Sequence, residues 1–206
     1  MEYASPIGTL RLFAWDGILQ RLLLPGESLT PRELSYLPEE EKPPIAHSPA
    51  KALEDAILWL DDYFAGRRPA PWTGPLPTLG TPYQKRVWNA LRTIPYGETR
   101  TYLQIAQIAA APGTTPCPRA AGQALNKNPL PILLPCHRVI AITGALTGFA
   151  AGLNMKERLL LHEKGGGRKE EVRPGFRLAK PIAGIYRRLR KARPYWLVGT
   201  AGRRKE

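Results

Sequence analysis

Cysteine is scarce in this 206-residue chain, which contains only Cys117 and Cys136. Two cysteines are too few for a disulfide framework, and free thiols persist best in a reducing compartment. The sequence has no run of about 18 apolar residues, which excludes a membrane-spanning helix. Its first residues lack the basic and apolar segments of a secretion signal. We therefore expect a cytoplasmic protein with reduced cysteines.

Acidic residues are also few, because 17 Asp and Glu stand against 30 Lys and Arg, giving a formal net charge of +13. The excess is uneven, since residues 165–206 hold 13 basic and 3 acidic residues. A basic surface favours polyanions because binding releases counterions from phosphates. Charge alone does not separate DNA from RNA or an anionic membrane.

The start of the chain predicts a β-hairpin. Thr9–Trp15 and Ile18–Leu24 are apolar runs that flank Asp16-Gly17, a strong signal for a two-residue hairpin turn. Residues 25–47 are rich in Pro and Glu and predict a loop or a short irregular excursion.

A helix is expected after this loop, beginning at Ser48-Pro49, where Ser caps and Pro occupies the first turn. Its apolar face consists of Leu53, Ile57, Leu60 and Phe64, and Gly66 ends it. Residues 67–80 contain four prolines and two glycines, which is typical of a linker. We therefore expect an N-terminal α/β domain over residues 1–75.

Residues 76–165 predict a second, mainly helical domain. Helices are expected over residues 82–92, 101–109, 119–126 and 156–163. A short Gly-containing turn joins the second and third of these, which is the helix-turn-helix pattern. Leu130–Leu134 is expected to be an extended apolar run leading to Cys136.

Residues 166–206 form a basic C-terminal extension. It follows the joint Gly165-Gly166-Gly167 and places Ile182, Ile185 and Leu189 on one helical face. Two interpretations remain open: the extension adds contacts to DNA phosphates, or it packs on the body of the protein with its charges solvated.

Cys136 is a candidate nucleophile. A cysteine attacks only as a thiolate, so it needs a neighbour that takes or screens its proton. His137 and Glu163 could supply a Cys–His–carboxylate relay. Adjacent side chains on an extended segment point to opposite faces, so a bridging water would link Cys136 to His137. The alternative is a buried structural cysteine beside an incidental histidine.

Other chemistries fit less well. A structural zinc site needs four clustered ligands, whereas Cys117, Cys136, His47, His137 and His162 are scattered. A cysteine protease needs a separated Cys and His with an orienting Asn or Asp, and nothing favours that arrangement over the relay. Cys117 is interpreted as a small filler residue.

An ordered series of motifs resembles the O6-alkylguanine-DNA alkyltransferases, also called methylated-DNA–protein-cysteine methyltransferases. The segment from Asn128 to Ile140, which contains Pro135-Cys136-His137-Arg138-Val139, looks like the signature of that family. Other motifs agree with it over about residues 1–165: Ser5–Leu10, Tyr63–Gly66, Gly80–Gln84, Ile94–Thr99, Thr101-Tyr102, Arg119–Gly122 and Glu163.

The resemblance implies both a fold and an activity. It implies a small N-terminal antiparallel-sheet, RNase H-like domain and a C-terminal domain with a winged-helix-like helix-turn-helix. The implied activity is stoichiometric DNA repair, in which the alkyl group of O6-alkylguanine, and of O4-alkylthymine, moves irreversibly to Cys136. No cofactor and no metal are implied, and the expected partner of the monomer is double-stranded DNA containing alkylated guanine.

The resemblance also implies the roles of individual residues. His137 and Glu163 would deprotonate Cys136, Asn128 would hold the active-site turn, and Tyr102 would donate its hydroxyl to the guanine ring. The carbonyl groups of Cys136 and Val139 would read the exocyclic amine of guanine.

The implied DNA interface is the helix from Arg119 to Asn126, lying in the minor groove against a flipped-out nucleotide. Arg119 would fill the vacated space, and small residues would allow close approach to the backbone. These small residues are Ala120, Ala121, Gly122 and Ala124. The alternative without a function is a solvated charge at a helix start for Arg119 and a core tyrosine for Tyr102.

The pocket loop departs from the commoner family pattern. Phe149 stands where tyrosine is usual, Ala150 follows it, and Ala151 stands where glycine or tryptophan occurs. A small Ala151 predicts an open pocket that accepts alkyl groups larger than methyl.

Two rival functions lie outside this chemistry. Some relatives bind alkylated bases without repairing them and carry tryptophan in place of the cysteine, so Cys136 argues against that role. A transcription regulator would read bases in the major groove, but the third helix offers few base-reading side chains beyond Gln123 and Asn126.

Overall fold

The computed structural model describes residues 1–35 and 49–165, which all belong to one compact unit. The expected helix start at Ser48, the candidate ligand His47 and the extension 166–206 lie outside the described residues. Within the described part, no helix is long and apolar enough to cross a membrane.

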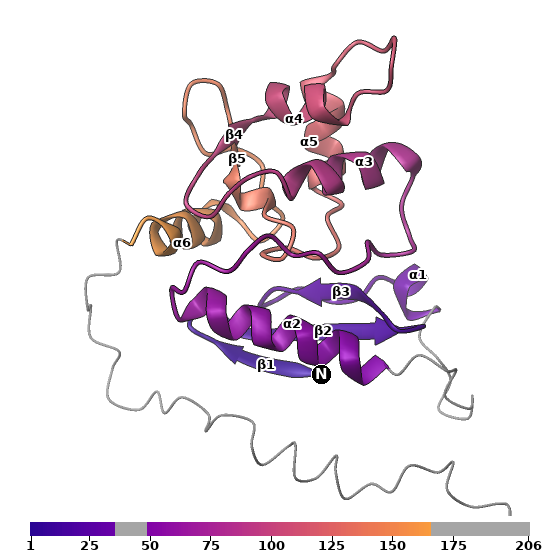
Figure 1. Cartoon of the computed structure of the whole chain (residues 1–206), viewed down its shortest axis with the longest axis vertical. Coiled ribbons are helices and arrows are strands. Elements are labelled where there is room, and N and C mark those ends of the chain that lie inside the picture. The colour runs from indigo at the N-terminus through magenta and orange to yellow at the C-terminus, as the bar shows by residue number, and fades with distance from the viewer. Residues whose placement is uncertain (36–48, 166–206) are drawn as a thin grey trace, which may run out of the picture. The chain divides into compact units, whose positions relative to one another are not determined.

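A three-stranded antiparallel sheet forms the N-terminal part, in the order β1 (Glu2–Ser5), β2 (Gly8–Trp15), β3 (Ile18–Leu23). The hairpin is confirmed, since Asp16 and Gly17 both have positive φ angles, of 54° and 71°, as a tight hairpin turn requires. Strand β1 escaped sequence analysis because its four residues show little alternation. Helix α2 (Pro49–Phe64) lies along the sheet (Figure 1).

The loop expected over residues 25–47 contains a short helix, α1 (Pro31–Leu34). Its start is fixed by a capping box, in which the Thr30 hydroxyl accepts from the Glu33 amide and the Glu33 carboxylate accepts from the Thr30 amide. A helix of four residues is too short for its apolar periodicity to be recognised in the sequence.

The C-terminal part is mainly helical. It contains α3 (Pro82–Leu91), α4 (Tyr102–Ala109), α5 (Pro118–Leu125) and α6 (Leu153–Glu163). Capping boxes start α3 at Thr81 and α4 at Thr101. Helices α3, α4 and α5 pack on one another at the end of the molecule away from α2 (Figure 1). The expected helices are confirmed, although α6 begins three residues earlier than expected.

The segment before Cys136 was predicted wrongly as extended. Residues Leu130–Leu134 form a turn, closed by a 2.8 Å bond from the Leu134 amide to the Leu130 carbonyl, and Ile132 has a φ of 75°. The next residues form a 3-10 helix, η1 (Cys136–Arg138). A buried apolar run of five residues does not reveal whether it is straight or folded back.

Strand β5 (Val139–Ile140) follows η1 and pairs in parallel with β4 (Arg100–Thr101). This two-residue pair ties the segment after the cysteine to the start of α4. The winged-helix character of this part stays a prediction.

One hydrophobic core joins the two parts. It runs without interruption from Leu10 and Leu60 to Trp88, Leu130 and Leu159. The backbone joins them as well, because the Leu22 amide of edge strand β3 donates to the Pro129 carbonyl at 2.8 Å. The division into domains 1–75 and 76–165 stays a prediction.

Candidate active site

Cys136 lies at the first position of η1 and is buried, with 8% of its surface exposed. The side-chain amide of Asn128 donates to its sulfur at 3.0 Å and to the Leu134 carbonyl at 2.7 Å. The Asn128 side-chain oxygen accepts from the Leu130 amide at 3.1 Å. Asn128 therefore orients the thiol and closes the turn that precedes it.

Burial raises the pKa of the Cys136 thiol to about 11, although the Asn128 hydrogen bond and the charge of Lys156 act in the opposite direction. The thiol is therefore protonated at neutral pH. A nucleophilic sulfur must lose its proton as it reacts, so a nearby base is required.

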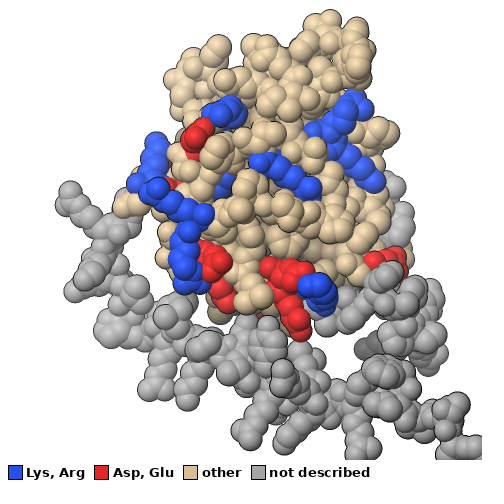
Figure 2. Space-filling view, viewed as in Figure 1, with Lys and Arg blue, Asp and Glu red and all other residues tan. Residues whose placement is uncertain are grey.

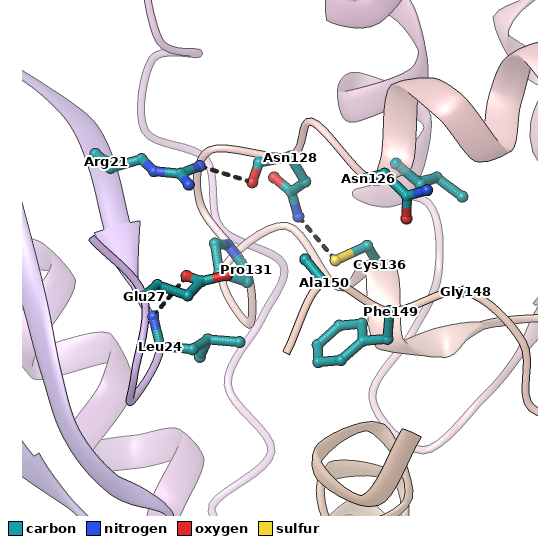
Figure 3. Close-up of a pocket in the computed structure, with 11 residues that line it drawn as sticks. Arg21, Leu24, Glu27, Asn126, Asn128, Pro131, Cys136, Gly148, Phe149 and Ala150 are labelled. Carbon is teal, nitrogen blue, oxygen red and sulfur yellow. Dashed lines mark hydrogen bonds between the residues drawn. The ribbon is translucent and has the colours of Figure 1, made fainter. Parts of the chain in front are cut away.

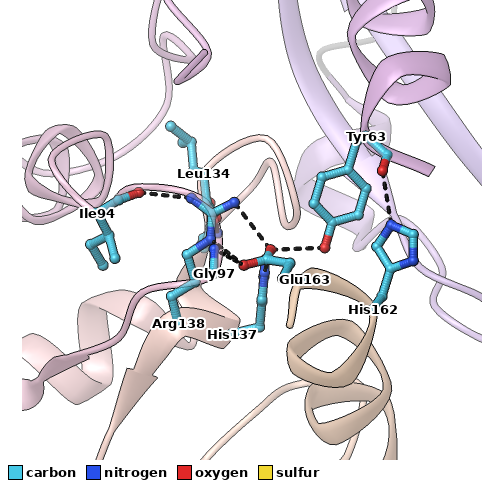
Figure 4. A network of polar contacts seen from close by, with 9 residues as sticks. Tyr63, Ile94, Gly97, Leu134, His137, Arg138, His162 and Glu163 are labelled. Atoms are coloured by element: carbon cyan, nitrogen blue, oxygen red, sulfur yellow. Dashed lines mark hydrogen bonds and ion pairs between the residues drawn. The ribbon is translucent and has the colours of Figure 1, made fainter. Parts of the chain in front are cut away.

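His137 and Glu163 are the candidates for such a base and its orienting partner (Figure 4). Both side chains are buried, and His137 Nε2 lies 2.6 Å from Glu163 Oε1. Burial lowers the pKa of His137, against the hydrogen bond and charge of Glu163, so the imidazole is neutral at neutral pH. Nε2 therefore carries the proton that Glu163 accepts, and Nδ1 keeps its lone pair. Nδ1 is buried without a partner among the described residues.

Glu163 is ionised and saturated with donors. Its Oε1 also accepts from the Tyr63 hydroxyl at 2.9 Å and from Arg138 Nη2 at 3.0 Å. Its Oε2 accepts from Arg138 Nε at 2.8 Å and from the Gly97 amide at 3.0 Å. Burial alone would raise the pKa of Glu163, but the hydrogen bonds and charges of His137 and Arg138 lower it to about 2.

A small pocket lies beside the Cys136 sulfur, with a volume of about 30 Å³ (Figure 3). Phe149 and Ala150, two predicted substrate-binding residues, line it from the pocket loop. The opposite wall comes from the N-terminal part of the chain, through Arg21, Leu24 and Glu27. This wall could not be predicted from the sequence, because only the packing of β3 against the Asn128 turn brings it there.

Tyr102 lies at the first position of α4, apart from this pocket. Its hydroxyl donates to the Thr147 carbonyl at 2.9 Å. It lines a separate hollow of about 440 Å³ with Arg119 and Ile142. Tyr102 must therefore change its hydrogen-bond partner before it can donate to a bound base.

Lys156 was missed as a site residue. Its side chain is fully buried, and Nζ donates to the Val139 carbonyl at 2.6 Å and to the Thr147 carbonyl at 2.7 Å. It also lies 5.8 Å from the centre of the Tyr102 ring. A lysine in phase with Leu159 on the core face of a helix was the signal that could have revealed it.

The predicted DNA-contacting helix is α5, with Arg119 exposed in its first turn. Ala121 and Ala124 lie in the core, so the outer surface of α5 carries Arg119, the half-buried Ala120 and Gln123. Gly122 packs near the Tyr102 ring.

Charge is distributed unevenly over the described residues. Residues 82–165 contain ten Lys and Arg but three Asp and Glu. On the face in Figure 2, acidic side chains gather mostly at the end formed by the sheet and α2. The part that carries Cys136 is therefore the more basic.

Residues 82–165 match the family model described as the 6-O-methylguanine DNA methyltransferase, DNA binding domain. A methylated-DNA–protein-cysteine methyltransferase of Mycobacterium leprae is 42% identical over 160 residues, which span 78% of this chain and 88% of the relative. The chain belongs to the methylated-DNA–protein-cysteine methyltransferase family.

Solved structures agree with this membership. The crystal structure of Mycobacterium tuberculosis O6-methylguanine methyltransferase is 40% identical, with a TM-score of 0.62 over 80% of this chain and 91% of the other. A crystal structure of Mycobacterium tuberculosis OGT in complex with DNA is 38% identical, with a TM-score of 0.60 over the same shares.

Proposed function

We propose that this protein repairs DNA by transferring the alkyl group of O6-alkylguanine, and of O4-alkylthymine, to Cys136. The observation that carries the proposal is a buried thiol that receives a hydrogen bond from Asn128, next in the chain to a neutral histidine oriented by Glu163. Membership of the methyltransferase family supports the same reaction.

The reaction is a single in-line displacement. A bond forms between the Cys136 sulfur and the alkyl carbon, while the bond from that carbon to O6 breaks and its electron pair stays with the base. The thiol proton passes through a bridging water to His137 Nδ1, and Glu163 stabilises the imidazolium that forms. The product is a thioether, so each molecule acts once.

Other groups act on the leaving base and on the pocket loop. Tyr102 donates its hydroxyl to the guanine ring once it has left the Thr147 carbonyl, which stabilises the charge that develops on the base. The carbonyls of Cys136 and Val139 accept from the exocyclic amine. Lys156 anchors the loop that carries Thr147 and also holds the Val139 carbonyl, so it positions both.

The DNA must present the damaged nucleotide outside the duplex, because the sulfur is buried and O6 lies inside the base stack. Helix α5 enters the minor groove, Arg119 fills the space that the base leaves, and Ala120 and Gly122 permit close approach. The ten basic residues of the 82–165 region attract the phosphate backbone. A relative has been crystallised in complex with DNA.

The 30 Å³ beside the sulfur is far smaller than a purine. The base therefore enters only if the loop around Phe149 shifts. We place the protein in the cytoplasm as a monomer, where its two free cysteines stay reduced.

The test is the mass of the intact protein after incubation with a duplex oligonucleotide that contains one O6-methylguanine. The expected result is one added methyl group, located on Cys136 by peptide mapping, with a plateau at one methyl per protein. Cys136→Ala is the inactive variant, and Cys117→Ala is the matched control that still reacts. Repeated turnover without an adduct would overturn the proposal.

A further inference from the structure

Tyr63 connects the N-terminal helix α2 to the catalytic relay. Its side chain is fully buried, and its hydroxyl donates to Glu163 Oε1 at 2.9 Å, across 100 residues of sequence. The same oxygen contacts His137 Nε2 at 2.6 Å. We propose that Tyr63 is a positioning residue for alkyl transfer, whose hydroxyl sets how strongly Glu163 stabilises protonated His137. This proposal rests on the proposed function.

The Tyr63 ring is held so that its hydroxyl donates to the Glu163 carboxylate, its one hydrogen-bond partner among the described residues (Figure 4). Its centre lies 5.5 Å from that of Trp59, 5.7 Å from that of Tyr96 and 5.1 Å from that of His162. His162 also contacts the Tyr63 backbone carbonyl through Nε2 at 2.8 Å. Burial raises the pKa of Tyr63 well above its ordinary value, so the hydroxyl stays a neutral donor.

Tyr63 affects the charge that His137 experiences, because both side chains share one oxygen of Glu163. Oε1 accepts from the Tyr63 hydroxyl, from His137 Nε2 and from Arg138 Nη2. Each donor disperses part of the negative charge that stabilises the imidazolium form of His137. Removing the Tyr63 hydroxyl leaves more of that charge to His137, so the pKa of His137 should rise.

The other groups near the relay do not depend on the Tyr63 hydroxyl. Arg138 donates to the Ile94 carbonyl and to both carboxylate oxygens, and Lys156 donates to two backbone carbonyls. Both cations lower the pKa of His137. Tyr96 lies near Glu163, and the His162 ring packs on Tyr63. These contacts survive the loss of one hydroxyl, which makes Tyr63→Phe a specific perturbation.

The experiment compares single-turnover rates of methyl transfer from an O6-methylguanine duplex between pH 4.5 and 9. His137 must be neutral to accept a proton, so the rate falls when the pH drops below the pKa of His137. In Tyr63→Phe, this acid limb should move up by about half to one pH unit, slowing the reaction about three- to tenfold on the limb. Rates above the limb should be nearly unchanged.

Tyr3→Phe is the matched control. The Tyr3 hydroxyl donates to the Asp61 carboxylate at 2.9 Å, so this variant also removes one tyrosine–carboxylate hydrogen bond, away from the relay. Its acid limb should stay in place. An unmoved limb in a folded Tyr63→Phe protein, or an equal shift in Tyr3→Phe, would overturn the proposal.

A second probe covers the case in which Tyr63→Phe does not fold. Replacing Tyr63 by 3,5-difluorotyrosine makes the hydroxyl a stronger donor, so the limb should move down, and an unmoved limb contradicts the proposal. A nitrogen NMR titration of His137 reports the same shift without any reaction. A wild-type protein that accepts no methyl group refutes the proposed function, whereas normal methylation with an unmoved titration refutes the role of Tyr63 alone.

Discussion

The amide nitrogen of Asn128 lies 3.0 Å from the sulfur of Cys136, although a turn of seven residues separates them in sequence. The same nitrogen holds the Leu134 carbonyl, and the Asn128 oxygen holds the Leu130 amide. One side chain therefore fixes the shape of the turn and lowers the pKa of the thiol at its end.

Replacing Asn128 by Ala should slow alkyl transfer and destabilise the protein. The variant leaves the buried Leu130 amide without its partner and removes one of two donors to the Leu134 carbonyl, which keeps the Cys136 amide. This loss costs about 1–3 kcal/mol. The rate should fall at least about tenfold, since the thiol pKa rises further. Denaturant unfolding and single-turnover rates measure the two effects. Asn89→Ala, at an exposed position on α3, is the control and should change neither.

Acid should destabilise the protein through Glu163. Its pKa is about 2 in the folded state against 4.5 as the ordinary value, so its contribution is complete above pH 4.5 and is lost as the pH falls toward 2. The loss is up to about 3 kcal/mol. His137, whose folded pKa is depressed, adds a loss in the same direction that begins near pH 6.5.

Urea unfolding at a series of pH values measures this dependence. Glu163→Gln should be less stable at pH 7, because Arg138 keeps its buried charge without a counterion. It should also lose the decline between pH 4.5 and 2. An equally steep decline in that variant would exclude Glu163 as the source.

Lys156→Met should slow alkyl transfer about tenfold or more while preserving the fold. Met keeps most of the buried apolar volume but no longer donates to the Val139 and Thr147 carbonyls, so the pocket loop keeps only the Tyr102 hydroxyl as a donor to Thr147. The thiol pKa should rise, because the charge of Lys156 lowers it. Reaction rates and a thiol titration check both effects. Lys164→Met, an exposed change just after α6, should leave both unchanged.

Substrate size tests the pocket loop. We expect O6-benzylguanine in DNA to alkylate Cys136, because Ala151 leaves the loop space to move. The volume beside the sulfur suits a methyl group, so Phe149 must swing outward for benzyl. Ala151→Trp should slow benzyl transfer more than methyl transfer. Adduct masses measure both reactions, and wild-type protein that takes methyl but not benzyl contradicts the expectation.

Deleting residues 166–206 tests the basic extension. If it contacts phosphates, the deletion should weaken binding to duplex DNA and flatten its dependence on salt. Fluorescence anisotropy at several salt concentrations measures this change. If the shortened protein binds DNA with unchanged affinity and unchanged salt dependence, the extension does not contact phosphates and its charges are merely solvated.

Local signals predicted much of the fold. Asp16-Gly17 specified the hairpin, and the helices expected from residues 82 and 101 begin at Pro82 and Tyr102. The turn at Ile132 could not be predicted, because isoleucine is β-branched and does not favour a left-handed φ. Packing imposes that φ on Ile132 in the folded protein.

The candidate site was predictable in its motifs but not in its supports. Cys136, His137, Asn128 and Glu163 came from the resemblance, and the structure brings them together. Tyr63 and the pocket wall at Leu24 come from the other end of the chain, so their place depends on long-range packing that no sequence spacing encodes.

The hydrogen bond from the Leu22 amide to the Pro129 carbonyl joins the N-terminal hairpin to the turn that precedes Cys136, here called the cysteine turn. A protein that reacts once cannot recover a thiol spent on the wrong electrophile. Both this hydrogen bond and the one from Tyr63 to Glu163 depend on long-range packing, so a partly unfolded molecule lacks both supports. We expect alkyl transfer to lack the help of the His137 relay until the whole protein has folded, which reserves that reaction for the complete repair protein.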